Sequence, residues 1–370
     1  MNNKTLVFKI DESNFADIIS KAARILKQGG TVAFPTETVY GLGADALDPD
    51  AVLKIFEAKG RPADNPLIVH IASMDSLDRI ATDISPIAFE LMDAFWPGPL
   101  TLVLKRKSVV PDITTGGLDT VAVRMPDNPV ALALIREAGT PLAAPSANTS
   151  GRPSPTTAEH VISDLSSRID AVIDGGAVEV GVESTVLDVT SDIPAILRPG
   201  GVSLEDIKKH VGEVVIGYTD QAVEESDVVR SPGMKYTHYS PKTRVVLVEG
   251  DGRAVATKMS ELIESYSKKN MRVGLLITDE TAEHVSAEHV SAEHVSAEHV
   301  SAEHVSADEM YSLGRRNVPE DAARNLFAGL RYMDGMDVDI IIVDGSVKCD
   351  GVGVAVLNRL RKSANELIEV

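Results

Sequence analysis

The stretch Lys59-Gly60-Arg61-Pro62-Ala63-Asp64-Asn65 joins a predicted helix, residues 51–59, to a predicted strand, residues 67–71. Apolar residues recur at three- and four-residue spacing in the helix, and the strand is a short apolar run. Farther along, the loop Ser146-Ala147-Asn148 follows another short apolar run, residues 142–144. Strands that alternate with helices in this way predict an α/β domain around one twisted sheet.

These two loops carry side chains that suit a phosphorylated small molecule. Lys59 supplies a point charge, and Arg61 supplies a planar fork that can hold two oxygens. Ser146 and Asn148 add neutral hydrogen bonds that fix orientation. The combination predicts a site for a nucleotide triphosphate. The chain contains no Gly-x-x-x-x-Gly-Lys-Ser/Thr sequence, so it is not a Walker-type ATPase.

The same patterns predict the other elements of the first part of the chain. Short apolar or β-branched runs bounded by Pro, Gly or Asp predict strands at 31–34, 67–71, 100–104, 121–124, 142–144, 171–173, 185–189 and 195–197. Helical spacing predicts helices at 15–27, 51–59, 86–94, 129–137, 157–165 and 204–210. We expect Asp48 and Ser203 to begin two of these helices.

The length of 370 residues favours two domains. We expect a first domain at 1–216, a linker or lid at 217–241, and a second domain at 242–370. In the second domain, predicted strands at 244–248, 273–278 and 338–343 alternate with predicted helices at 254–268, 319–333 and 352–362. This rhythm predicts a smaller Rossmann-like domain with a parallel sheet.

Composition restricts the classes of function and the compartment. The net charge is −19, from 36 Lys and Arg against 55 Asp and Glu, which argues against a large nucleic-acid surface. The single cysteine, Cys349, fits a reducing compartment. No apolar run approaches the ~20 residues that span a bilayer, and the first residues lack a secretory pattern. We therefore expect a cytoplasmic protein without a membrane segment.

A pentapeptide of the form Ser/Thr-Ala-Glu-His-Val repeats between residues 281 and 305. A period of five places successive His residues on different faces of a helix, and on alternating faces of a strand. Neither geometry aligns a ladder of metal ligands. We expect a surface insertion that arose by tandem duplication, with loose metal or partner binding as the alternative.

Further polar residues stand at predicted strand ends, where ligands bind in α/β folds. The stretch Phe34-Pro-Thr-Glu-Thr-Val-Tyr-Gly-Leu-Gly43 is expected to form a loop in which the Thr and Tyr side chains orient a small substrate. His70 could hold a carboxylate or a hydroxyl, or be a core residue. Arg124 suits a carboxylate better than a surface ion pair. We see no metal-ligand cluster in the sequence.

Several motifs, in order, resemble the YrdC-type threonylcarbamoyl-AMP synthase family in its long two-domain form. The resemblance covers roughly residues 15–241, and the remainder looks like the extra α/β domain of the long form. The motifs are Phe-Pro-Thr-Glu-Thr-Val-Tyr-Gly-Leu-Gly, Lys-Gly-Arg-Pro-Ala-Asp-Asn-Pro-Leu-Ile-Val-His, Phe-Trp-Pro-Gly-Pro-Leu-Thr, Ala-Pro-Ser-Ala-Asn, Val-Glu-Ser-Thr-Val-Leu-Asp, Leu-Arg-Pro-Gly and His-Tyr-Ser-Pro. The family's first domain has a twisted mixed sheet.

This resemblance implies that L-threonine, bicarbonate or CO2, and ATP with Mg²⁺ give threonylcarbamoyl-adenylate and pyrophosphate. A tRNA threonylcarbamoyltransferase complex would then transfer the group to adenosine 37 of tRNA. The family's charged and polar tetrad would fall on Lys59, Arg61, Ser146 and Asn148. Its ATP contacts would fall on Arg61, Asn65, Thr120, Ser146, Ser154 and Arg198. Its threonine contacts would fall on Thr38, His70, Arg124, Ala144 and Ser184. Tyr236 and His238 would lie in a lid over the pocket.

Two other functions compete with this interpretation. A carbamoyltransferase of the hydrogenase-maturation type shares the YrdC-like module, but it needs Cys-rich zinc fingers that a chain with one cysteine cannot form. A non-catalytic RNA-binding module could use the same concave surface, although the acidic balance weighs against it.

Overall fold

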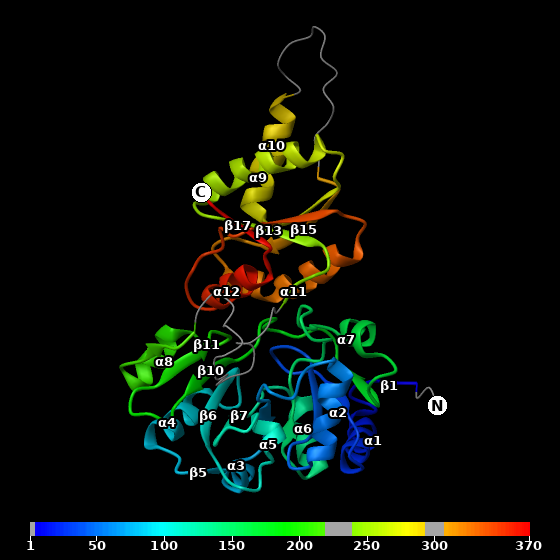
Figure 1. The fold of residues 1–370 in the computed structure, drawn as a ribbon, viewed down its shortest axis with the longest axis vertical. Helices are drawn as coiled ribbons and strands as arrows, with labels where there is room; N and C mark the ends of the chain where they lie inside the picture. The colour runs from blue at the N-terminus through cyan, green and yellow to red at the C-terminus, as the bar shows by residue number, and fades with distance from the viewer. Residues whose placement is uncertain (1–3, 219–238, 293–306) are drawn as a thin grey trace. The chain divides into compact units, whose positions relative to one another are not determined.

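The computed structural model describes residues 4–218, 239–292 and 307–370. The chain divides into two compact units, Met1–Tyr236 and Thr237–Val370. Each unit has its own sheet (Figure 1), so the predicted α/β class is confirmed. The separate linker expected at 217–241 falls largely outside the described residues and stays a prediction.

The first unit is built on a 12-stranded mixed sheet in the order β1-β9-β2-β3-β8-β4-β7-β6-β10-β11-β12, with β5 beside β6. Its strands are β1 (Leu6–Lys9), β2 (Val32–Phe34), β3 (Gly41–Asp45), β4 (Ile68–His70), β5 (Ala81–Thr82), β6 (Leu100–Arg106), β7 (Thr120–Arg124), β8 (Leu142–Ala143), β9 (Ala171–Asp174), β10 (Thr185–Asp188), β11 (Ala195–Arg198) and β12 (Val215–Ile216). Its helices are α1 (Phe15–Lys27), α2 (Pro49–Lys59), α3 (Met74–Ile80), α4 (Pro86–Phe95), α5 (Asp112–Thr115), α6 (Pro129–Ala138), α7 (Ala158–Leu165) and α8 (Leu204–Val211).

Alternating side chains bury both faces of this sheet. In β2, Val32 and Phe34 pack in the cluster formed with α1 and α6, whereas Ala33 belongs to the cluster on the opposite face. In β9, Ile173 and Val172 are divided in the same way. This period of two places helices on both faces, so polar groups at the strand ends are held by a rigid support.

The first predicted site residues, Lys59 and Arg61, lie at the C-terminal end of helix α2. Asp48 caps the helix by accepting a hydrogen bond from Asp50 N at 3.0 Å, as predicted. Gly60 ends the helix with a φ of 62°, in the left-handed region that a residue without a Cβ adopts readily. The chain therefore reverses between Lys59 and Arg61, which places both cations at the same end of the helix.

The second unit is an α/β/α layer around an all-parallel five-stranded sheet in the order β15-β14-β16-β13-β17. Helices α9 and α10 cover one face, and α11 and α12 cover the other (Figure 1). The predicted parallel domain is confirmed. Its elements are β13 (Arg244–Glu249), α9 (Gly252–Ser267), β14 (Val273–Thr278), α10 (Asp279–Ala292), β15 (Glu309–Gly314), α11 (Pro319–Gly335), β16 (Ile340–Asp344), α12 (Gly353–Ser363) and β17 (Glu366–Glu369).

The stretch expected to be one loop after β2 is partly a strand. Residues Gly41–Asp45 form β3, which pairs with β2 and with β8. Glycine weakens a strand in isolation, and this hid β3 in the sequence. Here Gly43 lies against the Phe34 ring, because a Cβ at Gly43 would come within 2.6 Å of that ring. The close approach of two strands therefore requires glycine.

The first pentapeptide copy belongs to the core of the second unit, which corrects the expectation of a surface insertion over 281–305. Thr281 is fully buried and Val285 is 3% exposed within the apolar cluster of that unit. Thr281 Oγ1 also accepts a hydrogen bond from Arg316 Nη2 at 2.7 Å. Helix α10 runs from Asp279 to Ala292, and residues 293–306 lie outside the described part of the chain.

Within the described residues, no helix combines the length and apolar character needed to cross a membrane.

Candidate functional site

Several loops of the first unit meet beyond the end of β2. Backbone hydrogen bonds join the segment around Glu37 and Tyr40 to two loops that come much later in the chain. Tyr40 N donates to Pro155 O at 2.9 Å, and Ala147 N donates to Tyr40 O at 2.8 Å. Val180 N donates to Glu37 O at 2.8 Å. These bonds hold the predicted site segments side by side.

The structure brings together three members of the predicted tetrad. The Lys59 ammonium group donates to Ser146 O at 2.5 Å and to Asn148 O at 2.7 Å. Ser146 Oγ donates to Asn148 Oδ1 at 2.6 Å. Lys59 is only 3% exposed, so its charge is held among carbonyl dipoles at the loop. The loop therefore carries positive charge and keeps a fixed shape.

Asp164, which the sequence analysis missed, anchors this loop from α7. Its carboxylate accepts hydrogen bonds from Arg152 Nη1 at 2.8 Å and from Thr149 N at 3.2 Å. Arg152 O in turn accepts a bond from Asn148 Nδ2 at 2.9 Å. The signal was an acidic side chain three residues after Val161, on the buried face of a predicted amphipathic helix, where an unpaired carboxylate would be costly.

Arg61 and Asn65 lie at opposite ends of the turn after α2. Arg61 Nη2 donates to Asn65 O at 3.4 Å, and the guanidinium lies 5.9 Å from the centre of the Phe56 ring. The Asn65 side chain is fully buried, yet its amide oxygen and nitrogen have no hydrogen-bond partner among the described residues. A buried amide without partners is ready to bind a polar ligand.

Arg124 ends β7 and points its guanidinium toward the segment after β2. Its Nε donates to Gly98 O at 3.1 Å, and its Nη1 donates to Thr38 Oγ1 at 2.9 Å. Arg124 Nη2 lies 2.6 Å from Glu37 Oε1, and both side chains are about 95% buried. The alternative of an ordinary surface ion pair is thus excluded, since the cation and its acidic neighbour are both inside the protein.

His70 stands beside Arg124 because β4 and β7 are parallel neighbours with these residues in register. Burial and the nearby Arg124 charge lower the pKa of His70 to about 3. The imidazole is therefore neutral near pH 7, and its buried Nδ1 has no hydrogen-bond partner among the described residues. A neutral ring can donate or accept a bond from a hydroxyl group.

A third cluster of polar side chains lies at β6, β10 and β11. Arg198 Nη2 donates to Ser184 O at 2.9 Å and to Ser184 Oγ at 3.2 Å, and Thr101 Oγ1 lies 2.8 Å from Ser184 Oγ. Ser154 Oγ donates to Glu183 Oε1 at 2.5 Å. Gly200 permits this packing, because a Cβ there would come within 2.3 Å of the Ser184 carbonyl carbon.

The remaining predicted residues are placed less uniformly. Ala144 is buried directly after β8, and its N donates to Ile68 O at 2.9 Å. Thr120 begins β7 while Arg124 ends it, so about 13 Å of strand separates them. Tyr40 is fully buried and its hydroxyl donates to Gly176 O at 2.7 Å, so it supports the loop, and its contact with a substrate stays a prediction. Tyr236 and His238 lie outside the described residues.

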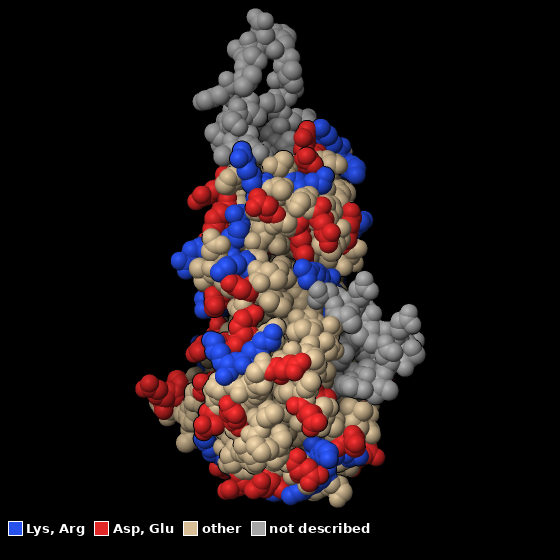
Figure 2. Space-filling model, turned by 90° about the vertical axis from the view of Figure 1, so that its left-hand side faces the viewer, with Lys and Arg blue, Asp and Glu red and all other residues tan. Residues whose placement is uncertain are grey.

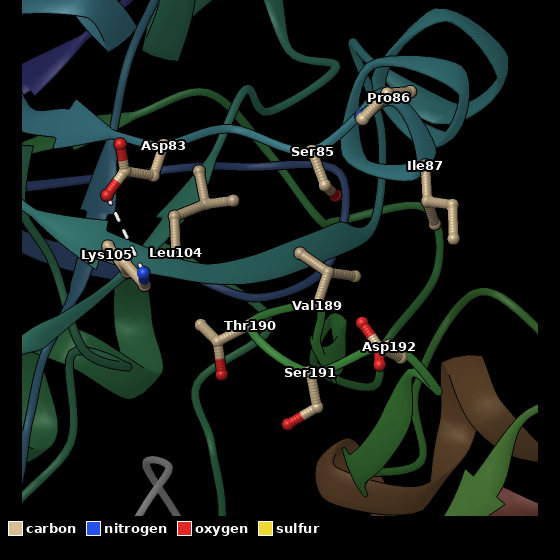
Figure 3. Close-up of a pocket in the computed structure, with 10 residues that line it drawn as sticks. All are labelled: Asp83, Ser85, Pro86, Ile87, Leu104, Lys105, Val189, Thr190, Ser191 and Asp192. Carbon is tan, nitrogen blue, oxygen red and sulfur yellow. Dashed lines mark ion pairs between the residues drawn. The ribbon is translucent and has the colours of Figure 1, made fainter.

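A separate surface pocket of about 400 Å³ contains none of the predicted site residues (Figure 3). Asp83 and Lys105 lie 3.6 Å apart on its wall as an exposed ion pair. Its lining has two carboxylates, Asp83 and Asp192, against the single cation Lys105, which does not suit a phosphorylated ligand, so we place the site at the buried polar groups instead. The described residues hold no cluster of three or more His, Cys, Asp or Glu side chains that could bind a metal.

Fold and site together define an α/β enzyme with buried groups suited to small charged ligands. Residues 24–200 match the Sua5/YciO/YrdC family model, described as telomere recombination. Residues 202–365 match the model of the threonylcarbamoyl-AMP synthase C-terminal domain. The chain belongs to the threonylcarbamoyl-AMP synthase family, and the resemblance in its sequence is confirmed.

Relatives of full length support this assignment. The threonylcarbamoyl-AMP synthase of Pyrococcus abyssi is 47% identical over 97% of this chain and 98% of its own length. That of Bacillus subtilis is 47% identical over 94% of this chain and 92% of its own. A crystal structure of P. abyssi Sua5 in complex with L-threonine matches with a TM-score of 0.88 and 47% identity, over 99% of this chain and 100% of that one.

Proposed function

We propose that this protein makes L-threonylcarbamoyl-adenylate and pyrophosphate from L-threonine, bicarbonate or CO2, and ATP. The observation that carries the proposal is the buried Arg124, beside the neutral His70 and the hydroxyl of Thr38. An arginine can bind the carboxylate of an amino acid, and a neutral ring and hydroxyl suit its side-chain hydroxyl. The 47% identical P. abyssi protein was solved with L-threonine, which supports the choice of amino acid.

L-Threonine would contact residues from five segments of the first unit. Arg124 would bind its carboxylate, and the neutral His70 would bond its hydroxyl. The small side chain of Ala144 leaves room for the ligand's methyl group. The threonine contacts we propose are Thr38, His70, Arg124, Ala144 and Ser184.

ATP, as its Mg²⁺ complex, would lie against the second set of polar groups. The Lys59 and Arg61 charges would face the phosphates, and the partnerless amide of Asn65 would gain its hydrogen bonds from the nucleotide. The contacts we propose for ATP are Arg61, Asn65, Thr120, Ser146, Ser154 and Arg198. With Lys59 and Asn148, these would orient the reactants. Mg²⁺ arrives with the nucleotide, since it binds phosphates with few protein ligands.

The chemistry needs positioning and charge, with no covalent bond to the enzyme. The amine of threonine adds to CO2 to form a carbamate, with loss of its protons to solvent. A carbamate oxygen then attacks the α-phosphorus of ATP, the bond to the β-phosphate oxygen breaks, and pyrophosphate leaves. Cations around the phosphates stabilise the charge that develops on pyrophosphate.

The product is a reactive mixed anhydride, so water must be kept from it. We propose that the linker residues Tyr236 and His238 act as part of a lid for this purpose. The acyl group would pass to a tRNA threonylcarbamoyltransferase complex, which modifies adenosine 37. The acidic chain would itself bind tRNA weakly or not at all.

Mass spectrometry of a reaction with ATP, labelled bicarbonate, L-threonine and Mg²⁺ tests the proposal, with pyrophosphate assayed in parallel. We expect labelled threonylcarbamoyl-adenylate together with pyrophosphate that depends on threonine. An Arg124→Gln variant should form neither. ATP consumption that is independent of threonine, or no product from folded protein, would overturn the proposal.

A further inference from the structure

Glu37 is a buried carboxylate that no step described above uses. It stands between two threonines in the segment after β2, and it is only 5% exposed. A buried carboxylate is costly unless charges and hydrogen bonds compensate it. The charges and hydrogen-bond donors around Glu37 therefore indicate its role.

The donors of Arg124 are only partly used. A guanidinium has five N–H groups in a planar fork. In Arg124, Nε bonds Gly98 O and one Nη1 hydrogen bonds Thr38 Oγ1. Nη2 is close to Glu37 Oε1, at 2.6 Å, but the pair is not aligned as a hydrogen bond. The unused N–H groups can thus donate hydrogen bonds to a ligand carboxylate, while Glu37 holds the cation in place by charge.

The acceptors of Glu37 are also unused. Neither carboxylate oxygen has a hydrogen-bond donor among the described residues. A carboxylate has about four positions for donors, so Glu37 can receive N–H groups from a ligand. A cationic group beside it would also relieve the repulsion between Glu37 and a carboxylate bound to Arg124.

The charges of this cluster sum to zero. Arg124 contributes one positive charge, Glu37 one negative charge, and His70 is neutral because its pKa is lowered to about 3. An α-amino acid at neutral pH is also a zwitterion without net charge. The positive Arg124 therefore matches the ligand's carboxylate, and the negative Glu37 matches its ammonium group.

We infer that Glu37 binds the ammonium group of the amino acid substrate and positions Arg124 to bind the carboxylate of that substrate. This inference rests on the proposed function, because it assigns a role within the same threonine site. It makes the site selective for a zwitterion over an ordinary hydroxy acid. The competing role for Glu37 is purely structural: it would hold Arg124 in place without contacting the ligand.

Calorimetry on the full chain with L-threonine and with 3-hydroxybutyrate, which lacks the ammonium group, separates these roles. We expect wild type to prefer L-threonine strongly. In E37Q the affinity for L-threonine should fall about tenfold or more, while that for 3-hydroxybutyrate should fall less, because only the positioning of Arg124 is lost for this ligand. The KM for L-threonine should rise more than kcat falls. E57Q, which alters an exposed glutamate on α2, is the matched control and should behave as wild type.

The outcomes separate the inference from the function on which it rests. If E37Q binds L-threonine as wild type does, or loses both ligands equally, the inference is overturned and the function stands. If wild type binds no L-threonine, the proposed function fails first. E37D keeps the charge one methylene farther back and should retain part of the preference, which tests the inference even if E37Q does not fold. An E37D that binds both ligands as wild type does would contradict it.

Discussion

Lys59 and Glu37 differ in how well the sequence reveals them. Lys59 ends an amphipathic helix before a glycine, and this position predicted a cation at the site, where the structure has it bonded to two loop carbonyls. Glu37 carried no such signal, because a lone acidic residue among threonines resembles an exposed loop. Only the tertiary contact with Arg124 distinguishes it. Local patterns reveal helix ends, whereas pairs of distant residues need the fold.

Lys59 is expected to stabilise the folded state as well as the site. In Lys59→Met, two buried carbonyls lose charged hydrogen bonds, so the free energy of unfolding should fall by about 3 kcal/mol. Urea unfolding measures it. Lys54→Met is the matched control, because Lys54 on the same helix also bonds a carbonyl, Gly29 O, but is exposed. Its loss should cost less than about 0.5 kcal/mol. Equal effects would show that the buried bonds of Lys59 do not matter.

The pKa of His70 predicts a dependence of stability on pH. The folded-state pKa of about 3 lies below the ordinary value, so the unfolded chain binds a proton that the folded protein does not. Stability is therefore lost as pH falls below about 6.5, by about 1 kcal/mol between pH 7 and pH 5.5.

Urea unfolding of wild type and His70→Gln over pH 5 to 7.5 checks this expectation. The variant should lose less stability on acidification than wild type, since glutamine does not titrate. An NMR signal of the His70 ring that titrates near pH 6.5 in the folded protein would contradict it.

At the scale of elements, periodic segments were predicted well and short or exposed ones were missed. Helix α1 was predicted at its observed bounds, since its apolar residues repeat with clear helical spacing. Strand β1 was missed because Leu6 and Val7 are half exposed at the edge of the sheet. Strand β3 was missed because of its glycines. Both strands are stabilised by pairing with neighbouring strands, and the local sequence of a strand does not show which strands it will pair with.

The pentapeptide block allows a test of where the core of the second unit ends. Deletion of residues 286–305 removes four copies but keeps Thr281 and Val285. Deletion of residues 281–305 removes these two buried side chains as well. We expect the shorter deletion to leave the melting temperature and the synthase rate nearly unchanged. The longer deletion should destabilise the second unit by about 2 kcal/mol or more, because an apolar contact and a hydrogen bond are lost.

Differential scanning calorimetry of the two deletion variants measures this difference. Equal melting temperatures would show that the first copy is dispensable to the core. A large loss in the shorter deletion would show that the later copies are structural too.

For the whole molecule, charge predicts weak binding to nucleic acid. The net charge is −19, and acidic and basic side chains are interspersed over the face shown in Figure 2. In gel shift experiments at about 0.15 M salt, we expect no specific complex with tRNA. Adenylate synthesis should proceed without tRNA. A tight complex that weakens steeply with salt, in a protein that consumes no ATP, would favour the RNA-binding alternative.

Strand β9 lies between β1 and β2, although residues 171–174 come long after both in the chain. The hydrogen bond from Thr5 Oγ1 to Ile169 O closes a separation of 164 residues. A ribosome makes the outer strands first, so the nascent chain must wait for most of the first unit before this part of the sheet can form. Folding should therefore be slow and mostly late in synthesis, with apolar surface exposed meanwhile to chaperones.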